Sequence, residues 1–296
     1  MKVGAVDIGS NSMRLLITDG TTEFGRFEEV TGLGRGVDRS GTLTPEGIED
    51  SLVALAGFGA IMDAEGVERR RAIATSAARD ASNRELFFDL AQSALSVRPM
   101  LVSGEEEARL AFVGATAGLS ALGHQLPPPV VVSDIGGGST ELVTAEGAMS
   151  VDIGSLRLTE RVIPSRPAPP AEMAAARSLL ADLFREVTME VGTLVGVAGT
   201  WTSLAAIARD LARYSTETVH GHQMTRIELE SVIDSLAGRT VEETAAIPAL
   251  HPKRAPVILA GSLVAEAVMR VLGTVEVVVS GRDTLDGVAM DLLALP

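Results

Sequence analysis

Two short stretches of the chain combine an aspartate with glycines and small polar side chains. They read DIGSNS at residues 7–12 and DIGGGS at residues 134–139. Glycine lets the backbone come close to an anion and adopt positive φ, and successive amides in such a turn form a nest for phosphate oxygens. One such turn is typical of an ordinary hairpin, but two of them about half a chain apart favour a phosphate-binding function.

Carboxylates within and after these turns suit the chemistry of a hard cation. Mg²⁺ prefers oxygen ligands, keeps several waters and often joins one or two carboxylates to a substrate phosphate. Asp7, Asp134 and Glu141 are the candidate ligands for Mg²⁺ (or Mn²⁺). The alternatives are that both aspartates cap their turns through side-chain hydrogen bonds, and that Glu141 faces outward from a strand.

The residues around the first turn predict an α/β lobe. A strand is expected after the turn, so the motif differs from the Rossmann and P-loop fingerprints, in which a helix follows. Thr44 is a candidate N-cap for a helix at residues 45–65, and Ser103 is one for a helix that opens with three glutamates. The expected strands cover residues 2–6, 13–19, 23–31 and 71–75, and a further helix covers residues 84–93.

A proline-rich linker at residues 125–129 precedes a repeat of the opening strand–turn–strand pattern. Internal similarity of this kind indicates a duplicated architecture. We expect two related α/β lobes that face each other across a cleft: residues 1–124 form the N-terminal lobe, residues 125–283 form the C-terminal lobe, and the last helix, residues 284–296, can pack back on the first lobe. The second lobe is expected to hold strands at residues 149–152, 193–198 and 275–279 and helices at residues 168–187, 200–213, 226–237 and 254–272.

The composition narrows the class of protein and of partner. A net charge of −14 argues against nucleic acid as a partner, because nucleic-acid-binding surfaces are usually basic, so any cations at a polyanion site must be local. The chain has no cysteine, which excludes disulfides and thiol catalysis and fits a cytoplasmic location. Its first residues do not form a signal peptide, and no stretch reaches the roughly 18 apolar residues of a membrane span, so we expect no membrane association.

Several motifs recur in a specific order along the chain. DIGSNS with Arg14 is followed by ATSAAR at residues 74–79, SGEEEAR at residues 103–109 and DIGGGSTE at residues 134–141. This set, together with GVAGT at residues 196–200, resembles the exopolyphosphatase/guanosine pentaphosphate phosphohydrolase (Ppx/GppA) family over essentially the whole chain. The resemblance implies two RNase H-like lobes of the actin, sugar kinase and heat-shock chaperone ATPase superfamily, with the active site in the cleft between the lobes.

The resemblance also implies roles for individual residues. Glu107 matches the glutamate that activates the attacking water, and Arg79 and Glu141 complete the expected catalytic set; without the motif, the simpler interpretation of Glu107 is a solvated carboxylate in the first turn of a helix. The metal set is Asp134, Glu141 and Asp7. The expected substrate contacts come from the two turns and the strand after the first: Ser10, Asn11, Ser12, Arg14, Gly136, Gly137, Gly138 and Ser139.

These observations predict an exopolyphosphatase that removes the terminal phosphate of inorganic polyphosphate by metal-assisted attack of water. Three alternatives stay open: a guanosine pentaphosphate phosphohydrolase of the stringent response, a kinase or ATPase of the same fold with a nucleotide pocket near residues 196–200, and a non-catalytic sensor of polyphosphate or an alarmone. Longer members of the family carry C-terminal helical domains linked to long-chain binding, so a chain of 296 residues predicts a preference for short polyphosphates. A homodimer is left open as well.

Three further features have no assigned role. Residues 280–287 resemble a family motif, but Asp286 stands where an arginine is common. Arg35 and Arg39, in a glycine-rich loop, could line a polyanion path. His220 and His222 have a spacing that could bind metal, but with no cysteine and no third histidine nearby in sequence, a polar loop is the simpler interpretation.

Overall fold

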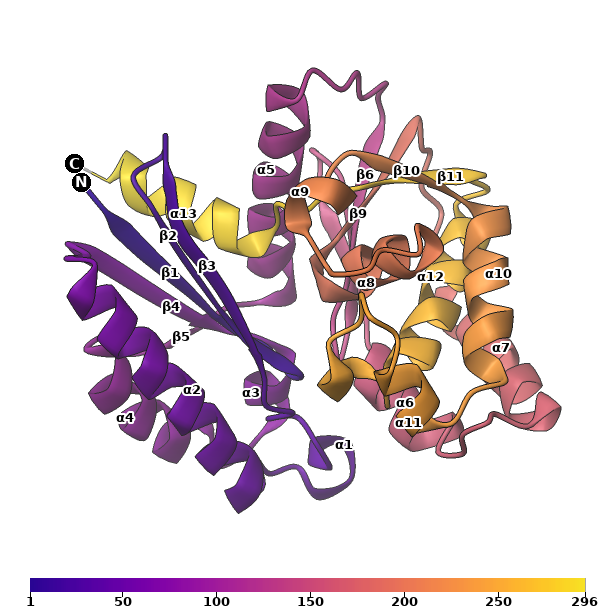
Figure 1. Ribbon diagram of the computed structural model, residues 1–296, viewed down its shortest axis with the longest axis horizontal. Helices are drawn as coiled ribbons and strands as arrows, with labels where there is room; N and C mark the ends of the chain where they lie inside the picture. The colour runs from indigo at the N-terminus through magenta and orange to yellow at the C-terminus, as the bar shows by residue number, and fades with distance from the viewer. Residues whose placement is uncertain (296) are drawn as a thin grey trace. The chain divides into compact units, whose positions relative to one another are not determined.

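The computed structural model describes residues 1–295, which form two compact units. Unit 1 combines Met1–Gly114 with the segment that begins at Asp283, and unit 2 is the continuous stretch Ala115–Arg282. Figure 1 follows the elements along the chain. Each unit has its own sheet, with one apolar core in unit 2 and two in unit 1, so each is described by itself. Among residues 1–295, no helix is both long and apolar enough to cross a bilayer.

Unit 1 is built on a mixed five-stranded sheet with the order β3-β2-β1-β4-β5. β1 pairs antiparallel with β2 and parallel with β4, so the first hairpin lies at the centre of the sheet. The strands are β1 (Val3–Ile8), β2 (Ser12–Thr18), β3 (Glu23–Val30), β4 (Arg69–Ala74) and β5 (Met100–Leu101). The helices are α1 (Val37–Ser40), α2 (Pro45–Ala64), α3 (Ser76–Asp80), α4 (Arg84–Leu95), the start of α5 (Gly104–Ala121), and α13 (Thr284–Ala294).

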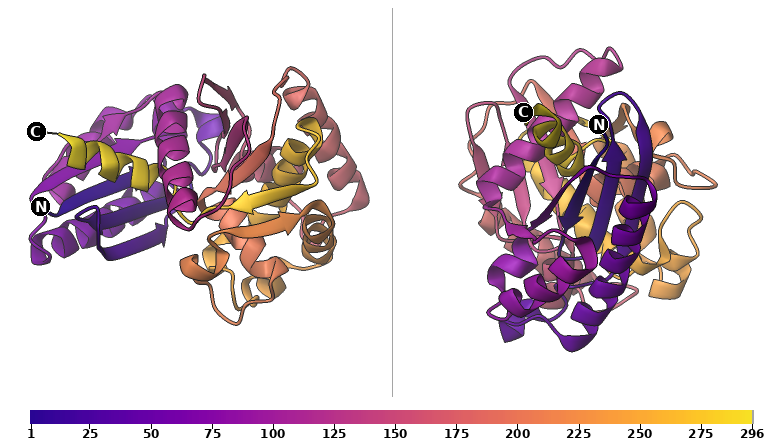
Figure 2. Two further views of the ribbon diagram at one scale, coloured as in Figure 1. Left: turned by 90° about the horizontal axis from the view of Figure 1, so that it is seen from above. Right: turned by 90° about the vertical axis from the view of Figure 1, so that its left-hand side faces the viewer.

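The sheet of unit 1 separates two apolar cores, because successive side chains of a strand point to opposite faces. Val6 and Ile8 of β1 belong to the core that α2 and α4 complete. Val3 and Ala5 belong to the core that α13 completes. Figures 1 and 2 show α13 on one side of this sheet and α2 with α4 on the other. Since Asp7 follows the same alternation, it lies on the α13 face.

Unit 2 is built on a six-stranded sheet with the order β10-β11-β9-β6-β7-β8. β6 pairs antiparallel with β7 and parallel with β9, as β1 does with β2 and β4. The strands are β6 (Val130–Ile135), β7 (Thr140–Val143), β8 (Ala148–Val151), β9 (Thr193–Val197), β10 (His222–Thr225) and β11 (Glu276–Val279). The helices are α6 (Ser155–Val162), α7 (Pro170–Phe184), α8 (Ala198–Ala208), α9 (Thr216–Val219), α10 (Arg226–Ala237), α11 (Val241–Ala245), the 3₁₀ turn η1 (Pro252–Arg254) and α12 (Ile258–Val271).

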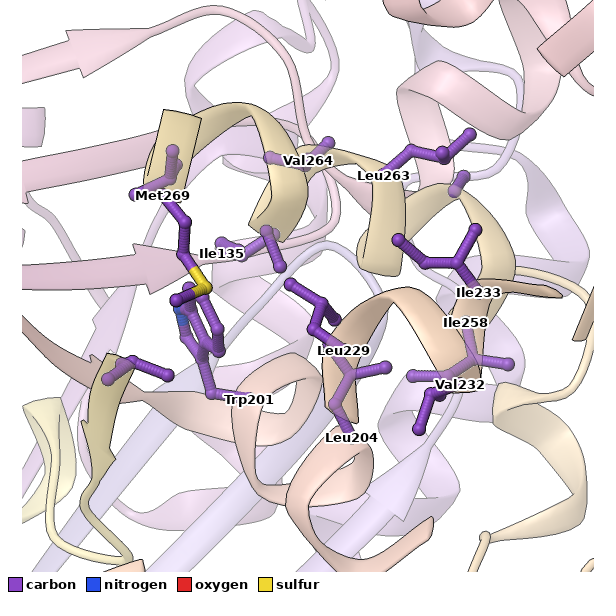
Figure 3. Packing of buried hydrophobic residues seen from close by; sticks show 14 of the residues in the cluster. Ile135, Trp201, Leu204, Leu229, Val232, Ile233, Ile258, Leu263, Val264 and Met269 are labelled. Atoms are coloured by element: carbon purple, nitrogen blue, oxygen red, sulfur yellow. The ribbon is translucent and has the colours of Figure 1, made fainter. Parts of the chain in front are cut away.

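One large apolar cluster fills unit 2 (Figure 3). Trp201 is fully buried in it, and its indole N–H donates to the Ser133 hydroxyl at 3.2 Å. The ring lies over Gly196, where a Cβ would come within 2.6 Å of it. The buried Trp201 ring therefore packs the first turn of α8 against β9.

The two sheets share one strand order. In unit 2, β8-β7-β6-β9-β11 repeats the order β3-β2-β1-β4-β5 with the same directions at the central strands, and β10 adds an antiparallel edge. This repetition confirms the expected α/β fold with two RNase H-like lobes. The predicted N-caps are also confirmed, since the hydroxyls of Thr44 and Ser103 accept from the amides of Gly47 and Glu106, both at 3.1 Å.

Some elements differ from the sequence expectation. The division between the units falls inside α5 rather than between residues 124 and 125, because Leu110 packs in the α13 core while Gly118 of the same helix lies against Arg282 of unit 2. The expected helix at residues 254–272 begins only at Ile258, after the 3₁₀ turn η1. The polar-loop interpretation of His222 is wrong, because this residue starts the edge strand β10.

Candidate active site

The turn between β1 and β2 is closed by one backbone hydrogen bond and is held by the loop after β3. The Gly9 N–H donates to the Ser12 carbonyl at 3.0 Å, and a Cβ on Gly9 would lie 2.9 Å from that oxygen. The Ser10 carbonyl accepts from the Gly34 N–H at 2.7 Å, and the Asn11 carbonyl accepts from two loop amides at 3.0 Å. The amides of Ser10 and Asn11 themselves donate to no group in the described part of the chain, so both can serve an anion.

The side chains of this turn lie close to the start of α3. The Ser10 hydroxyl accepts from the Ala77 N–H at 3.1 Å, and this bond is buried. Asn11 is half-buried and Ser12 is buried at the start of β2. The structure thus brings three of the predicted substrate contacts together and fixes α3, which carries Arg79, to the same turn.

Asp7 and Arg14 face each other across the first hairpin. Arg14 donates through Nε to Asp7 Oδ2 at 3.1 Å, adds a second bond from Nη2, and donates through Nη1 to Asp283. Burial raises the pKa of Asp7 despite the opposing effect of Arg14, and Asp7 Oδ1 has no hydrogen-bond partner among the described residues. The guanidinium expected to contact substrate is therefore engaged by two carboxylates within unit 1.

Glu107 lies in the first turn of α5 and Arg79 lies in α3. Arg79 Nη1 is 3.5 Å from Glu107 Oε2, and it also donates to the Val102 carbonyl at 2.9 Å. The Glu107 side chain is 12% exposed, whereas that of Glu106 is 44% exposed and holds Arg109. Of these two adjacent glutamates, Glu107 is thus the enclosed one and sits beside a cation.

The turn between β6 and β7 repeats the closure of the first turn. The Gly136 N–H donates to the Ser139 carbonyl at 3.0 Å. The carbonyls of Gly136 and Gly137 accept three amides from the N-terminus of α6, at 2.9 to 3.0 Å. Within the described residues, the amides of Gly137, Gly138 and Ser139 donate to no acceptor. The turn therefore has its carbonyls engaged and three N–H groups left for an anion.

The sequence reasoning missed α6 as a support for this turn. Gly154 precedes the helix in an extended conformation, and a Cβ there would lie 2.6 Å from the Gly136 carbonyl oxygen. Only glycine allows this approach of the helix to the turn. The signal in the sequence was the pair Gly154-Ser155 shortly after the strand that ends at Val151, since glycine and serine are common at the start of a helix.

Asp134 and Glu141 lie directly opposite each other on β6 and β7, on one face of the sheet. They are 5% and 1% exposed, and Glu141 Oε1 accepts from the Ser150 hydroxyl at 2.9 Å. Two buried carboxylates in such a pair repel each other, and a divalent cation would offset the repulsion. Residues 1–295 contain no group of three or more side chains arranged as metal ligands. The pair alone fits Mg²⁺, which often takes one or two protein carboxylates.

The two hairpins differ at one position of the repeated pattern. Asp7 and Asp134 occupy the same place, but the residue opposite is Arg14 in unit 1 and Glu141 in unit 2. The first pair joins opposite charges, whereas the second sets two carboxylates opposite each other. The carboxylate pair of unit 2 is therefore the stronger candidate for a cation, and Asp7 of unit 1, whose Oδ1 has no hydrogen-bond partner among the described residues, stays a separate prediction.

Two RNase H-like units, each with a glycine turn that presents free amides, define a phosphate-handling protein of the α/β class. Residues 20–295 match the Ppx/GppA phosphatase family. The chain is 37% identical over 317 aligned residues to "Exopolyphosphatase 2" of Mycobacterium tuberculosis, with 98% of both chains covered. Among solved structures, it is similar to an exopolyphosphatase-like protein (TM-score 0.92, 33% identity, 99% and 98% of the two chains covered). A Ppx/GppA family member from Aquifex aeolicus is also similar (TM-score 0.80, 30% identity, 99% and 98% covered).

The chain belongs to the Ppx/GppA phosphatase family. This confirms the family expected from the motifs and makes the protein a phosphatase of the hydrolase class.

Proposed function

We propose that this protein is an exopolyphosphatase that releases the terminal phosphate of inorganic polyphosphate. The observation that carries the proposal is the enclosed Glu107 carboxylate, 12% exposed and 3.5 Å from Arg79, which lies on the helix that Ala77 attaches to the Ser10 hydroxyl. Binding of a polyanion alone would not require an enclosed carboxylate, whereas hydrolysis requires a group that orients water and accepts its proton. The similarity to curated exopolyphosphatases supports polyphosphate as the substrate.

In the proposed reaction, Glu107 accepts a proton from water while the water oxygen attacks the terminal phosphorus in line. The bond from phosphorus to the bridging oxygen breaks, and the electron pair leaves with the shortened chain, so the products are orthophosphate and a polyphosphate one unit shorter. Arg79 offsets negative charge on the transferring group. The free amides at Ser10 and Asn11 in unit 1 suit phosphate oxygens, and so do those at Gly137, Gly138 and Ser139 in unit 2.

Asp134 and Glu141 would hold a divalent cation, with Mg²⁺ or Mn²⁺ as the metal of choice. When bound, such an ion neutralises charge on the phosphate oxygens and positions them. Removal of divalent cations with EDTA should abolish phosphate release, and added Mg²⁺ should restore it. Full activity in excess chelator would show that the reaction needs no divalent cation.

The decisive experiment measures phosphate release from short polyphosphate, long polyphosphate and guanosine pentaphosphate side by side, with Glu107→Gln as the background control. We expect release from polyphosphate, with guanosine pentaphosphate the weaker substrate. A preference for guanosine pentaphosphate would identify this alarmone as the substrate and indicate a role in the stringent response instead. Tight binding without release would indicate a sensor, and ATP turnover that needs an acceptor would indicate a kinase. The preference for short chains is a prediction that the same assay checks.

A cytoplasmic location and a homodimer are the remaining predictions about the protein in the cell. Light scattering on the purified protein measures the oligomeric state, and fractionation of cells that express a tagged chain measures the location.

A further inference from the structure

A groove of about 270 Å³ runs between α7 and α12 in unit 2, and it involves none of the residues assigned to phosphate hydrolysis. Its apolar lining includes Leu180 and Phe184 from α7 and Leu263 and Val271 from α12. Ligand pockets are typically apolar with a few placed polar groups, and this volume lies near the lower end of their range. The lining has no hydroxyl or amide side chain that could hydrogen-bond to a nucleobase or a sugar.

The polar part of the groove is a carboxylate that positions two guanidinium groups. Glu266 on α12 has a side chain that is 3% exposed. Its Oε2 accepts from Arg177 Nε at 2.8 Å, and its Oε1 accepts from Arg270 Nη2 at 2.8 Å. Since both oxygens are used, Glu266 fixes one arginine on each wall of the groove.

The two arginines keep most of their hydrogen-bonding capacity. A guanidinium offers five N–H donors, and each of these groups spends one on Glu266 and none on any other residue of the described chain. Arg185 adds a third positive charge to the lining, and its nearest carboxylate, 3.7 Å away, belongs to the exposed Glu186. Three cations against one buried carboxylate leave a local positive excess in a chain whose net charge is −14.

We propose that this groove binds a small amphipathic carboxylate, with the hydrocarbon tail on the apolar floor and the head group on Arg177 and Arg270. The planar guanidinium fork matches a carboxylate in geometry and charge, and two forks fixed in advance lose little freedom on binding. An aliphatic tail suits the floor because its apolar residues, among them Ala181, Ala267 and Val271, carry no hydrogen-bonding group in their side chains. The site is independent of the phosphate chemistry, so the proposal stands whether or not polyphosphate is the substrate.

Calorimetric titration of the intact protein with decanoate tests the proposal, with decanol as the uncharged probe of equal tail length. We expect saturable binding of one decanoate per chain, with decanol at least tenfold weaker. Shorter carboxylates should bind roughly fourfold more weakly per methylene removed, as expected for burial of about 0.8 kcal/mol per methylene. Equal affinity for decanol, or no saturable binding up to millimolar decanoate, would overturn the proposal.

Two matched pairs of variants locate the site. Ala181→Trp fills the groove and should weaken decanoate at least tenfold, whereas Ala175→Trp, exposed on the same helix outside the lining, should bind as the wild type does. Arg185→Gln leaves the Glu266 contacts intact and should weaken binding severalfold, whereas Arg270→Lys keeps the charge but loses the fork and should weaken it further. If Ala175→Trp is as damaging as Ala181→Trp, the site lies elsewhere. If Ala181→Trp instead dissociates a dimer, the groove is a subunit interface and the proposal fails.

Discussion

Arg79 and Glu107 lie 3.5 Å apart, although they come from two different motifs and are 28 positions apart in the sequence. Arg79 is fixed by its bond to the Val102 carbonyl and by the attachment of α3 to the Ser10 hydroxyl. Glu107 is fixed by the first turn of α5. The ion pair thus joins helices α3 and α5 of unit 1.

Glu107→Gln should lower kcat by about 10²- to 10⁴-fold, the usual contribution of general-base assistance, while Kd for substrate changes little. Glutamine keeps the size and one acceptor oxygen but cannot take a proton. Phosphate-release kinetics and equilibrium binding of the same polyphosphate separate the two effects. Glu105→Gln and Glu106→Gln are the controls, because Glu106 holds Arg109 in an exposed pair worth only about 0.2–1 kcal/mol. If Glu106→Gln is the damaging change, another residue activates the water.

Glu141→Gln should raise the Mg²⁺ concentration for half-maximal activity at least tenfold, because one of two opposed carboxylates loses its charge. The same variant should unfold no more easily than the wild type in metal-free buffer, since glutamine keeps the acceptor for Ser150 and relieves the repulsion with Asp134. Metal titration of activity and thermal unfolding in chelator measure the two effects. Ser150→Ala serves as the control for the lost hydrogen bond. An unchanged metal requirement in Glu141→Gln argues that the ion binds elsewhere.

Gly154→Ala should destabilise the protein by about 1–3 kcal/mol and reduce kcat/KM, because the added Cβ would lie 2.6 Å from the Gly136 carbonyl oxygen. The helix that supports the second turn would have to shift. Gly147→Ala in the hairpin between β7 and β8 is the matched control, since a Cβ there meets nothing within 4 Å, and we expect its stability to stay within about 0.5 kcal/mol of the wild type. Urea unfolding checks both, and equal effects at the two positions would contradict the role given to Gly154.

Asp286→Asn should change how the stability of the protein depends on pH. Burial raises the pKa of Asp286 above 3.8, although Arg26 opposes the rise. Burial also lowers the pKa of Arg26, but the negative charges of Asp286, Asp283 and Glu23 outweigh this effect and raise it. The ion pair therefore favours the charged form of Arg26, whereas burial disfavours the charged form of Asp286. The folded protein then binds more protons than the unfolded chain, so stability falls as pH rises from about 3.8 through the folded pKa.

The free energy of unfolding, measured at several pH values from 4 to 7, checks this sign. The difference between the variant and the wild type should shift in favour of the variant as the pH rises and then become constant. Asp182→Asn, at an exposed position on α7, is the control. A difference between Asp286→Asn and the wild type that does not vary with pH would show that burial of the carboxyl carries no cost.

The sequence predicts strands well where an apolar stretch runs into a glycine turn, as at β1 and β6. The predicted bounds of α10 match the observed ones at both ends. Short helices such as α6 were missed because fewer than three turns give no clear period. The duplication was visible because both turns need glycine at the same place, and both turns close with the same hydrogen bond.

The partner of Arg14 could not be predicted. Its guanidinium binds Asp7, seven residues away, and Asp283, which lies 269 residues later in the chain. Contacts of that separation depend on the packing of α13 on the sheet and leave no local pattern. The position opposite Asp134 was equally hidden, because only the register of the strands shows that Glu141 faces it.

Unit 1 is formed by two segments that lie far apart in the chain, so its parts are synthesised at different times. Its sheet is complete once β5 has been made, but the core on one face needs Leu285, Val288 and Leu292 of α13. A ribosome must first translate all of unit 2, whose residues are continuous and can fold as they emerge. Until α13 arrives, the core that holds Val3, Ala5 and Leu16 lacks the side chains that this helix contributes. The first strand to leave the ribosome is thus among the last to be covered, and this face is where a chaperone has its longest opportunity to bind.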